Sequence, residues 1–217
     1  MSSVLLRSTL ALALGLSALA APAFAAGDFA ACFTLTPGVS WSNGSETLSI
    51  SEATVAGEPA LAVTTSGGGV SSATVHDRSG RQLLAQIRYG IAAWGGDAAE
   101  PVMTDTFDPA PAFPATAKPG ERFTVTGKGE RTNHAQDTVS DLEFDGFSDY
   151  TFVGHEDLEV EIDFKPRTFA NTCHLTTTFE DGRAEVWYAP GFGRIKFQRY
   201  SGDSLLMSDE ISSIVNE

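Results

Sequence analysis

The sequence lacks several features that would define its class at once. Lys and Arg number 14 against 28 Asp and Glu, and this net charge of −14 argues against nucleic acid or anionic lipid headgroups as electrostatic partners. After residue 26 no apolar run is long enough to cross a bilayer. The chain is nevertheless 42% hydrophobic, which is typical of a globular protein, and its 21 glycines are far too few for a collagen.

The first 25 residues are typical of a secretory signal peptide. Arg7 supplies the positive start, residues 10–19 are apolar, and Ala23-Phe24-Ala25 matches a small-residue cleavage site. A membrane-spanning helix needs about 20 apolar residues, which is longer than this run. We therefore expect cleavage near Ala25, a mature chain of residues 26–217, and a location in the periplasm or outside the cell.

The expected mature chain holds two cysteines, Cys32 and Cys173. An even count in an exported protein favours a disulfide, and a single pair leaves no ambiguity of connectivity. Closing so long a loop would remove denatured-state entropy worth on the order of 5 kcal/mol. Two unpaired buried thiols are one alternative. Lipidation of Cys32 is another, although Asp28 and Phe29 depart from the apolar sequence that it requires.

Alternation of apolar and polar residues predicts a mainly β protein. Leu158, Val160 and Ile162 alternate with acidic residues, as the two faces of a half-buried strand require. Similar runs occur at 48–55, 60–65, 83–89, 123–126, 173–179, 184–188 and 194–200. Asp181-Gly182 between two such runs indicates a hairpin. The only weak helix candidates are a turn near 97–100 and the last ten residues.

Half of the ten prolines fall within residues 101–119. Proline cannot donate to a β ladder, so this stretch is predicted to be a long extended connection. Turns at Pro37-Gly38 and Pro119-Gly120 each precede an aromatic that enters a strand, and a third stands at Pro190-Gly191. The part before the connection is too small to be stable alone, so we interpret residues 26–217 as one β-rich domain.

Three short motifs suggest chemistry but are incomplete. Gly202-Asp203-Ser204-Leu205 spells the nucleophile block of GDSL esterases, yet no His follows it to serve as base. His155-Glu156 begins like a zinc-protease motif without its second His. The stretch from Asp141 imitates a calcium loop, with Phe152 where a bidentate Glu is needed. We therefore predict no catalytic set, metal site or cofactor, and a hydrolase using Ser204 is the remote alternative.

The acidic surplus is concentrated in residues 137–163, which carry ten carboxylates and no Lys or Arg. Acidic side chains within 159–163 would project from one strand face about 7 Å apart, at a cost of about 0.6 kcal/mol per neighbouring pair. Solvent, a bound cation or a basic neighbour must offset this repulsion. Arg194 and Lys196 share one face of their own strand, so one hypothesis makes the two strands near neighbours.

The three tryptophans, Trp41, Trp94 and Trp187, are candidates for an apolar ligand face. Large aromatic residues in β proteins also form plain core, because each buries a large apolar area. Both interpretations stay open at this point.

Several blocks together resemble an uncharacterised family of bacterial periplasmic β-rich proteins, the TapB-like group. The blocks are 33–41, 106–109 with 118–120, 151–160, 168–173 and 185–196. The last block, which contains Trp-Tyr-Ala-Pro-Gly-x-Gly-x-Ile-Lys, is the most specific. The resemblance implies a curved antiparallel sheet that forms an incompletely closed half-barrel, similar to the LolA/LolB lipoprotein carriers, whose concave face holds acyl chains.

The leading hypothesis is a non-catalytic periplasmic protein that binds a lipid or a partner peptide on its concave face. The alternative is a structural or assembly component that binds another envelope protein through an exposed sheet edge. Neither hypothesis requires a membrane-spanning segment in the mature chain.

Overall fold

The computed structural model describes residues 28–67, 70–90, 100–144 and 149–216. Within these residues the regular structure is almost entirely antiparallel β, which confirms the predicted mainly β class with a curved, unclosed sheet. The strands belong to two sheets, and neither sheet closes on itself. The expected signal peptide, Trp94 and most of the turn predicted near 97–100 lie outside the described residues.

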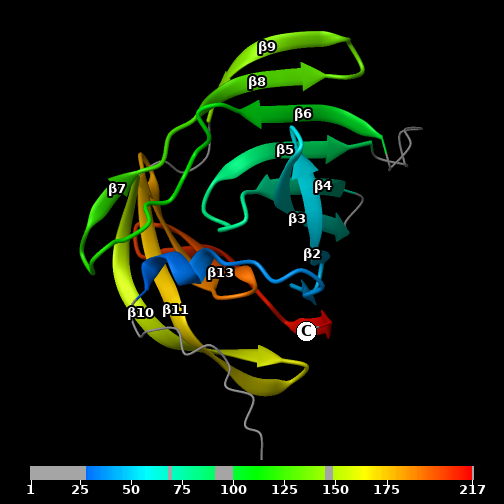
Figure 1. Ribbon diagram of the computed structural model, residues 1–217. Coiled ribbons are helices and arrows are strands. Elements are labelled where there is room, and N and C mark those ends of the chain that lie inside the picture. Colours follow the sequence, from blue (N-terminus) through cyan, green and yellow to red (C-terminus); the bar gives the residue numbers. More distant parts are fainter. Residues whose placement is uncertain (1–27, 68–69, 91–99, 145–148, 217) are drawn as a thin grey trace, which may run out of the picture.

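The larger sheet has nine strands (Figure 1). In pairing order they are β15 (Ser213–Asn216), β1 (Ser40–Ser42), β2 (Glu46–Val55), β3 (Glu58–Gly67), β4 (Val70–His76), β5 (Leu83–Tyr89), β6 (Pro101–Phe107), β8 (Lys128–Asn133) and β9 (Thr138–Glu143). From β1 to β6 the strands pair in chain order, so most of this sheet is a meander.

The smaller sheet has six strands. In pairing order they are β14 (Ser204–Glu210), β13 (Gly193–Ser201), β12 (Gly182–Ala189), β11 (Lys165–Phe179), β10 (Asp149–Ile162) and β7 (Arg122–Thr124). The predicted hairpin joins β11 to β12, with Phe179 opposite Gly182 across the turn. The chain passes repeatedly between the sheets, because β7 lies between β6 and β8 in sequence and β15 follows β14.

The three predicted Pro-Gly turns are confirmed. Gly38, Gly120 and Gly191 have φ values of +93°, +85° and +86°, which glycine adopts without steric cost. In each turn the N–H two residues after the proline donates to the carbonyl of the residue before it, at 3.2, 2.9 and 3.1 Å. The chain therefore enters β1, β7 and β13 through the type II geometry expected of Pro-Gly.

Two local predictions were wrong. The Pro-rich segment is not wholly a connection, because Pro101–Phe107 forms β6, where Pro101 is the first residue and its missing N–H is tolerated. Residues 208–216, the described part of the last ten residues, are not helical: they end β14 and form β15, which pairs with β1. An unpredicted element, the 3-10 helix η1 (Phe29–Phe33), begins where the Asp28 side chain accepts a hydrogen bond from Ala30 N–H at 3.0 Å.

The hypothesis that pairs the acidic strand with Arg194 and Lys196 was also wrong, since β11 and β12 separate β10 from β13. Arg194 instead lies 3.4 Å from Asp209, and Lys196 lies 3.1 Å from Glu210, both on β14. The turn at 202–203 makes β13 and β14 a hairpin. Arg194 and Lys196 therefore pair with acidic residues that are close in sequence, and not with those of the distant β10. The carboxylates of Glu159 and Glu161 are exposed to solvent.

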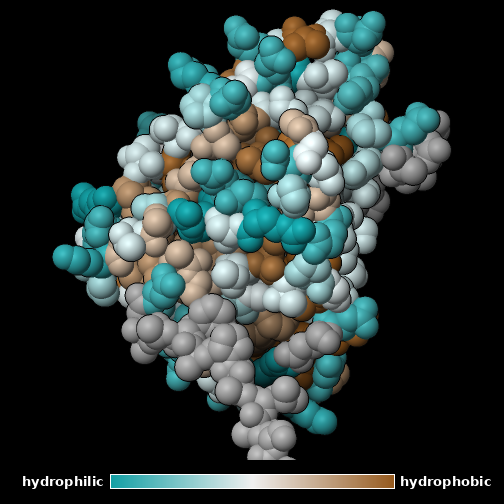
Figure 2. All heavy atoms as spheres, in the orientation of Figure 1, coloured by the Kyte–Doolittle hydropathy of each residue, from teal (hydrophilic) through white to brown (hydrophobic). Residues whose placement is uncertain are grey.

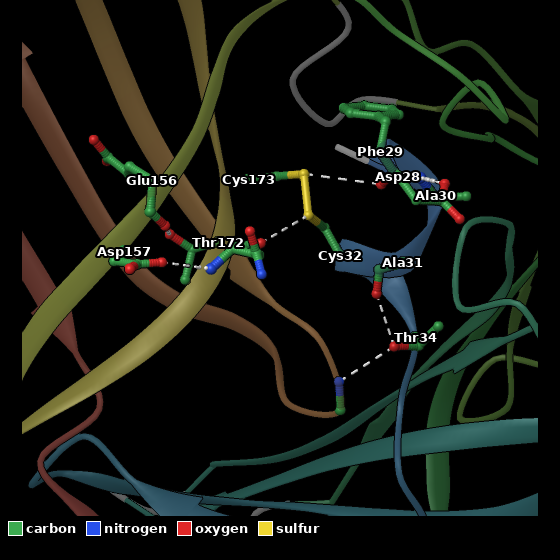
Figure 3. The surroundings of a disulfide bond; sticks show 12 residues. Asp28, Phe29, Ala30, Ala31, Cys32, Thr34, Glu156, Asp157, Thr172 and Cys173 are labelled. Atoms are coloured by element: carbon green, nitrogen blue, oxygen red, sulfur yellow. Dashed lines mark hydrogen bonds between the residues drawn. A yellow bond between two sulfur atoms is a disulfide. The ribbon is translucent and has the colours of Figure 1, made fainter. Parts of the chain in front are cut away.

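The predicted disulfide is present and connects the two halves of the fold (Figure 3). Cys32 belongs to η1 and Cys173 to β11, and both residues are almost fully buried. Because η1 leads through Pro37-Gly38 into β1, the bond ties the entry to the larger sheet to a central strand of the smaller one. A core cluster also spans both sheets, with Trp41 and Ile50 on one side and Val160, Phe169 and Ile195 on the other.

Reduction of the disulfide should lower the free energy of unfolding by about 2 to 5 kcal/mol, because the reduced chain regains loop entropy in the unfolded state. Urea denaturation of the wild type with and without a phosphine reductant measures this difference. The matched control is the double variant Cys32→Ala and Cys173→Ala, whose midpoint should not respond to reductant. An unchanged wild-type midpoint in verified reduced protein contradicts the expectation.

Candidate functional site

A cavity of about 390 Å³ lies between the two sheets. Side chains of the larger sheet form one wall, and side chains of β12 and β13 form the opposite wall. The volume falls within the range of small-molecule sites, about 300 to 1,000 Å³. Figure 2 shows hydrophobic surface lying behind hydrophilic side chains near the centre of the face that it presents.

The wall on the larger sheet follows from strand alternation. Leu48 on β2 pairs with Thr65 on β3, and Val63 on β3 pairs with Thr74 on β4, so these side chains form adjacent rows. Successive residues of a strand face opposite sides, so Ser51 on β2 faces away from the cavity. The facing wall carries Val186, Phe192 and Phe197.

Aromatic rings delimit one part of the cavity. Phe33 stacks on Phe113, with ring centroids 4.3 Å apart, and lies 5.0 Å from the ring of Tyr188. The Phe113 ring lies 5.3 Å from that of Tyr150. Phe33 directly follows Cys32, so the disulfide holds this ring in place at the cavity wall.

Polar groups gather beside these rings. Tyr188 on β12 and Arg194 on β13 are cross-strand partners, and both line the cavity together with Tyr150. Burial raises the pKa of both tyrosines above the ordinary value, and the positive charge of Arg194 acts in the opposite direction on each. The two hydroxyls therefore stay protonated at neutral pH, next to a guanidinium, and can act as hydrogen-bond donors.

A second arginine, Arg81, reaches the cavity from the loop between β4 and β5. Its Nη1 donates to the backbone carbonyl of Phe113 at 3.0 Å. Gly80 fixes the loop, because its φ is +74° and an added Cβ would lie 1.8 Å from the carbonyl oxygen of Phe33. Only glycine permits this approach, so the arginine is anchored against the disulfide-bonded segment.

One histidine belongs to the cavity wall on the larger sheet. The Nε2 atom of His76 lies 3.1 Å from the Thr74 hydroxyl. Burial lowers the pKa of His76 from 6.5 to about 4, and the carboxylate of Asp77 only partly opposes this shift. The imidazole is therefore neutral at pH 7, and the wall is uncharged at this point.

Of the three predicted tryptophans, the two that the structure describes, Trp41 and Trp187, belong to one buried core cluster. Trp41 is buried and lines the cavity. Trp187 packs in the core, where its Nε1–H donates to Glu156 and its ring stacks on His174 at 4.3 Å. Trp94 lies outside the described residues. The alternation of β12 could have revealed that Trp187 is not a cavity residue. Val186 and Tyr188 line the cavity, so the residue between them faces the other side of the strand.

The two residues of the incomplete zinc motif, His155 and Glu156, have different neighbours. His155 lies beside the disulfide, and its ligand atom and the two sulfurs all lie within 4.8 Å of one another. Because the sulfurs are bonded to each other, this group offers one imidazole rather than three ligands. Glu156 lies 3.5 Å from Nδ1 of His174, and Nε2 of the same ring lies 3.4 Å from Glu185.

The GDSL-like block forms a tight turn. Ser204 begins β14 and pairs with Ser201 across the turn, and its side chain is exposed. Residues 202 and 203 form this turn, and β14 is followed by one further strand, β15.

The geometry defines an antiparallel β protein with an apolar cavity between two sheets. No protein-family model, curated protein or solved structure matches this chain. Among the described residues, no helix combines the length and apolar character needed to cross a membrane.

The pKa of His76 predicts acid sensitivity. The unfolded imidazole takes up a proton near pH 6.5 and the folded one only near pH 4, so the free energy of unfolding should fall between these values, by about 3 kcal/mol. His76→Gln should lose this part of the pH dependence, as measured by urea denaturation from pH 7 to pH 4. The exposed His134→Gln is the control and should keep it. An identical pH profile in His76→Gln and wild type contradicts the assignment.

Proposed function

We propose that this protein is a non-catalytic binding protein of the bacterial periplasm that holds an apolar molecule between its two sheets. The observation that carries the proposal is the cavity of about 390 Å³, lined mainly by side chains such as Leu48, Val63 and Phe192. Apolar walls with a few convergent polar groups are the usual composition of a small-molecule site.

The proposed location is supported by two independent features. The first 25 residues have the pattern of an export signal, and the Cys32–Cys173 disulfide suits an oxidising compartment. An acyl chain is the ligand class that the resemblance to the TapB-like group, and through it to the LolA/LolB carriers, implies. A cavity bounded by β-sheet walls is compatible with such a chain.

Filling the cavity should abolish binding. Val63→Trp places an indole among the cavity walls, so the affinity for the fluorescent probe N-phenylnaphthylamine should fall at least about tenfold. Ser51→Trp adds the same group to the exposed face of β2 and should bind the probe like the wild type. Equal affinity of Val63→Trp and wild type, in variants with matching urea midpoints, contradicts the proposal.

Assembly through a sheet edge is a second candidate, favoured by β14. This edge strand exposes Leu205, Leu206 and Met207 by 51%, 60% and 49%. Three consecutive exposed residues mean that both faces of the strand are uncovered within the described structure. Such an edge is a template for pairing with another strand.

A second copy of the chain is the partner we propose for this edge. Antiparallel pairing of two β14 strands would bring together the exposed Leu205–Met207 segments of the two copies, and Leu206, which has no partner on β13, lies at the centre of each segment. Sedimentation equilibrium should then show a dimer that Leu206→Lys converts to a monomer. Val139→Lys changes an equally exposed side chain on edge strand β9 and should leave the dimer intact. A wild-type monomer at millimolar concentration excludes this second candidate.

A further inference from the structure

Four of the polar residues that line the cavity are tyrosines and arginines, and their chemistry restricts the ligand more than the apolar walls do. Tyr150, Tyr188, Arg81 and Arg194 all line the cavity, and the rings of Phe33 and Phe113 connect them. The facing wall on β2 and β3 offers Leu48, Val63 and the hydroxyl of Thr65. A bound molecule that satisfies both regions must itself have a polar end and an apolar body.

The tyrosines provide donors and no charge. Burial raises the pKa of both hydroxyls, so they remain protonated across the physiological range. The strongest hydrogen bond that a neutral hydroxyl can donate is to an anionic oxygen. Tyr188 faces Arg194 across the β12–β13 pair, so an oxygen placed between them can accept from both side chains.

The arginines favour an anion over a neutral acceptor. Arg194 lies 3.4 Å from Asp209 through one Nη atom, which leaves other N–H donors of the guanidinium available. Arg81 donates to a backbone carbonyl, and within the described part of the chain no carboxylate pairs with it. The side chain of Arg194 is 48% exposed, so this polar region opens to solvent. The cavity lining thus carries two positive charges, although the whole chain has a net charge of −14.

The size of the cavity limits the apolar part. A volume of about 390 Å³ lies near the lower end of the range for small-molecule sites. One acyl chain is therefore favoured over the two or three chains of a phospholipid or a lipoprotein anchor.

We infer that the ligand is a single-chain amphiphile with a carboxylate headgroup, held at its head by Arg194, Arg81, Tyr150 and Tyr188, and with its chain against Leu48 and Val63. This inference rests on the proposed function and names the ligand class for the same cavity. The net negative charge of the protein repels anions at long range, so recognition comes from these short-range contacts.

The test compares two ligands of equal chain length, dodecanoate and dodecanol, by displacement of N-phenylnaphthylamine from the full-length mature protein. The wild type should bind dodecanoate at least about tenfold more tightly than dodecanol. Arg194→Gln and Arg81→Gln should each weaken dodecanoate binding about tenfold and leave dodecanol binding within about twofold. Arg194→Lys keeps the charge and should retain most of the preference.

The matched control is Arg199→Gln, which removes a half-exposed arginine from the same strand as Arg194 but is not a cavity residue. Its affinities should equal those of the wild type. Tyr188→Phe removes one donor without changing the ring and should weaken dodecanoate binding only.

The outcomes distinguish failure of the headgroup assignment from failure of the proposed binding function. Equal binding of dodecanoate and dodecanol overturns the headgroup assignment and leaves the apolar cavity as the site. Loss of dodecanol binding along with dodecanoate in Arg194→Gln, in protein with a wild-type urea midpoint, also overturns it, because the arginine would then act through cavity shape. Failure of the probe and both ligands to bind the wild type overturns the proposed function itself.

Discussion

The bond between Cys32 and Cys173 is the constraint on which the cavity depends. It attaches η1 to the centre of the smaller sheet, while the residues directly after η1 enter the larger sheet. Phe33 is thereby fixed against Phe113 and Tyr188, and the loop at Gly80 packs on the carbonyl of Phe33. Both walls and the aromatic boundary of the cavity therefore meet at one covalently anchored segment, whose disulfide is drawn in Figure 3.

The two faces of the smaller sheet have different chemistry because side chains alternate along its strands. On β12, Val186 and Tyr188 face the cavity, whereas Trp187 packs with His174 and Glu156 elsewhere. This separation keeps the cavity mainly apolar and places the charged cluster outside it. The polar groups that do line the cavity are therefore few, and their positions decide which ligand chemistry fits.

The sequence could predict part of the candidate site. Trp41 was a candidate from its residue type, and it does line the cavity. Tyr188 and Arg194 lie within the block 185–196, but the block indicates no place in a cavity, since their positions depend on a cross-strand pairing shifted by an irregularity between Trp187 and Tyr188. No sequence pattern marks Arg81 as a cavity residue either, because this loop residue gains its position only through the tertiary contact of Gly80 with Phe33.

Local chemistry by itself determined the β class, the Pro-Gly turns, the β11–β12 hairpin and the pairing of the two cysteines. The β class depends on alternation, and the turns and the hairpin depend on the φ preferences of neighbouring residues. The cysteine pairing follows from the presence of a single thiol pair. The tertiary structure decided which strands are neighbours. It made Pro101–Phe107 a strand, paired the C-terminal residues with β1 and set β10 apart from β13. Such pairings join residues far apart in sequence, so no local pattern encodes them, and the cavity exists only as their consequence.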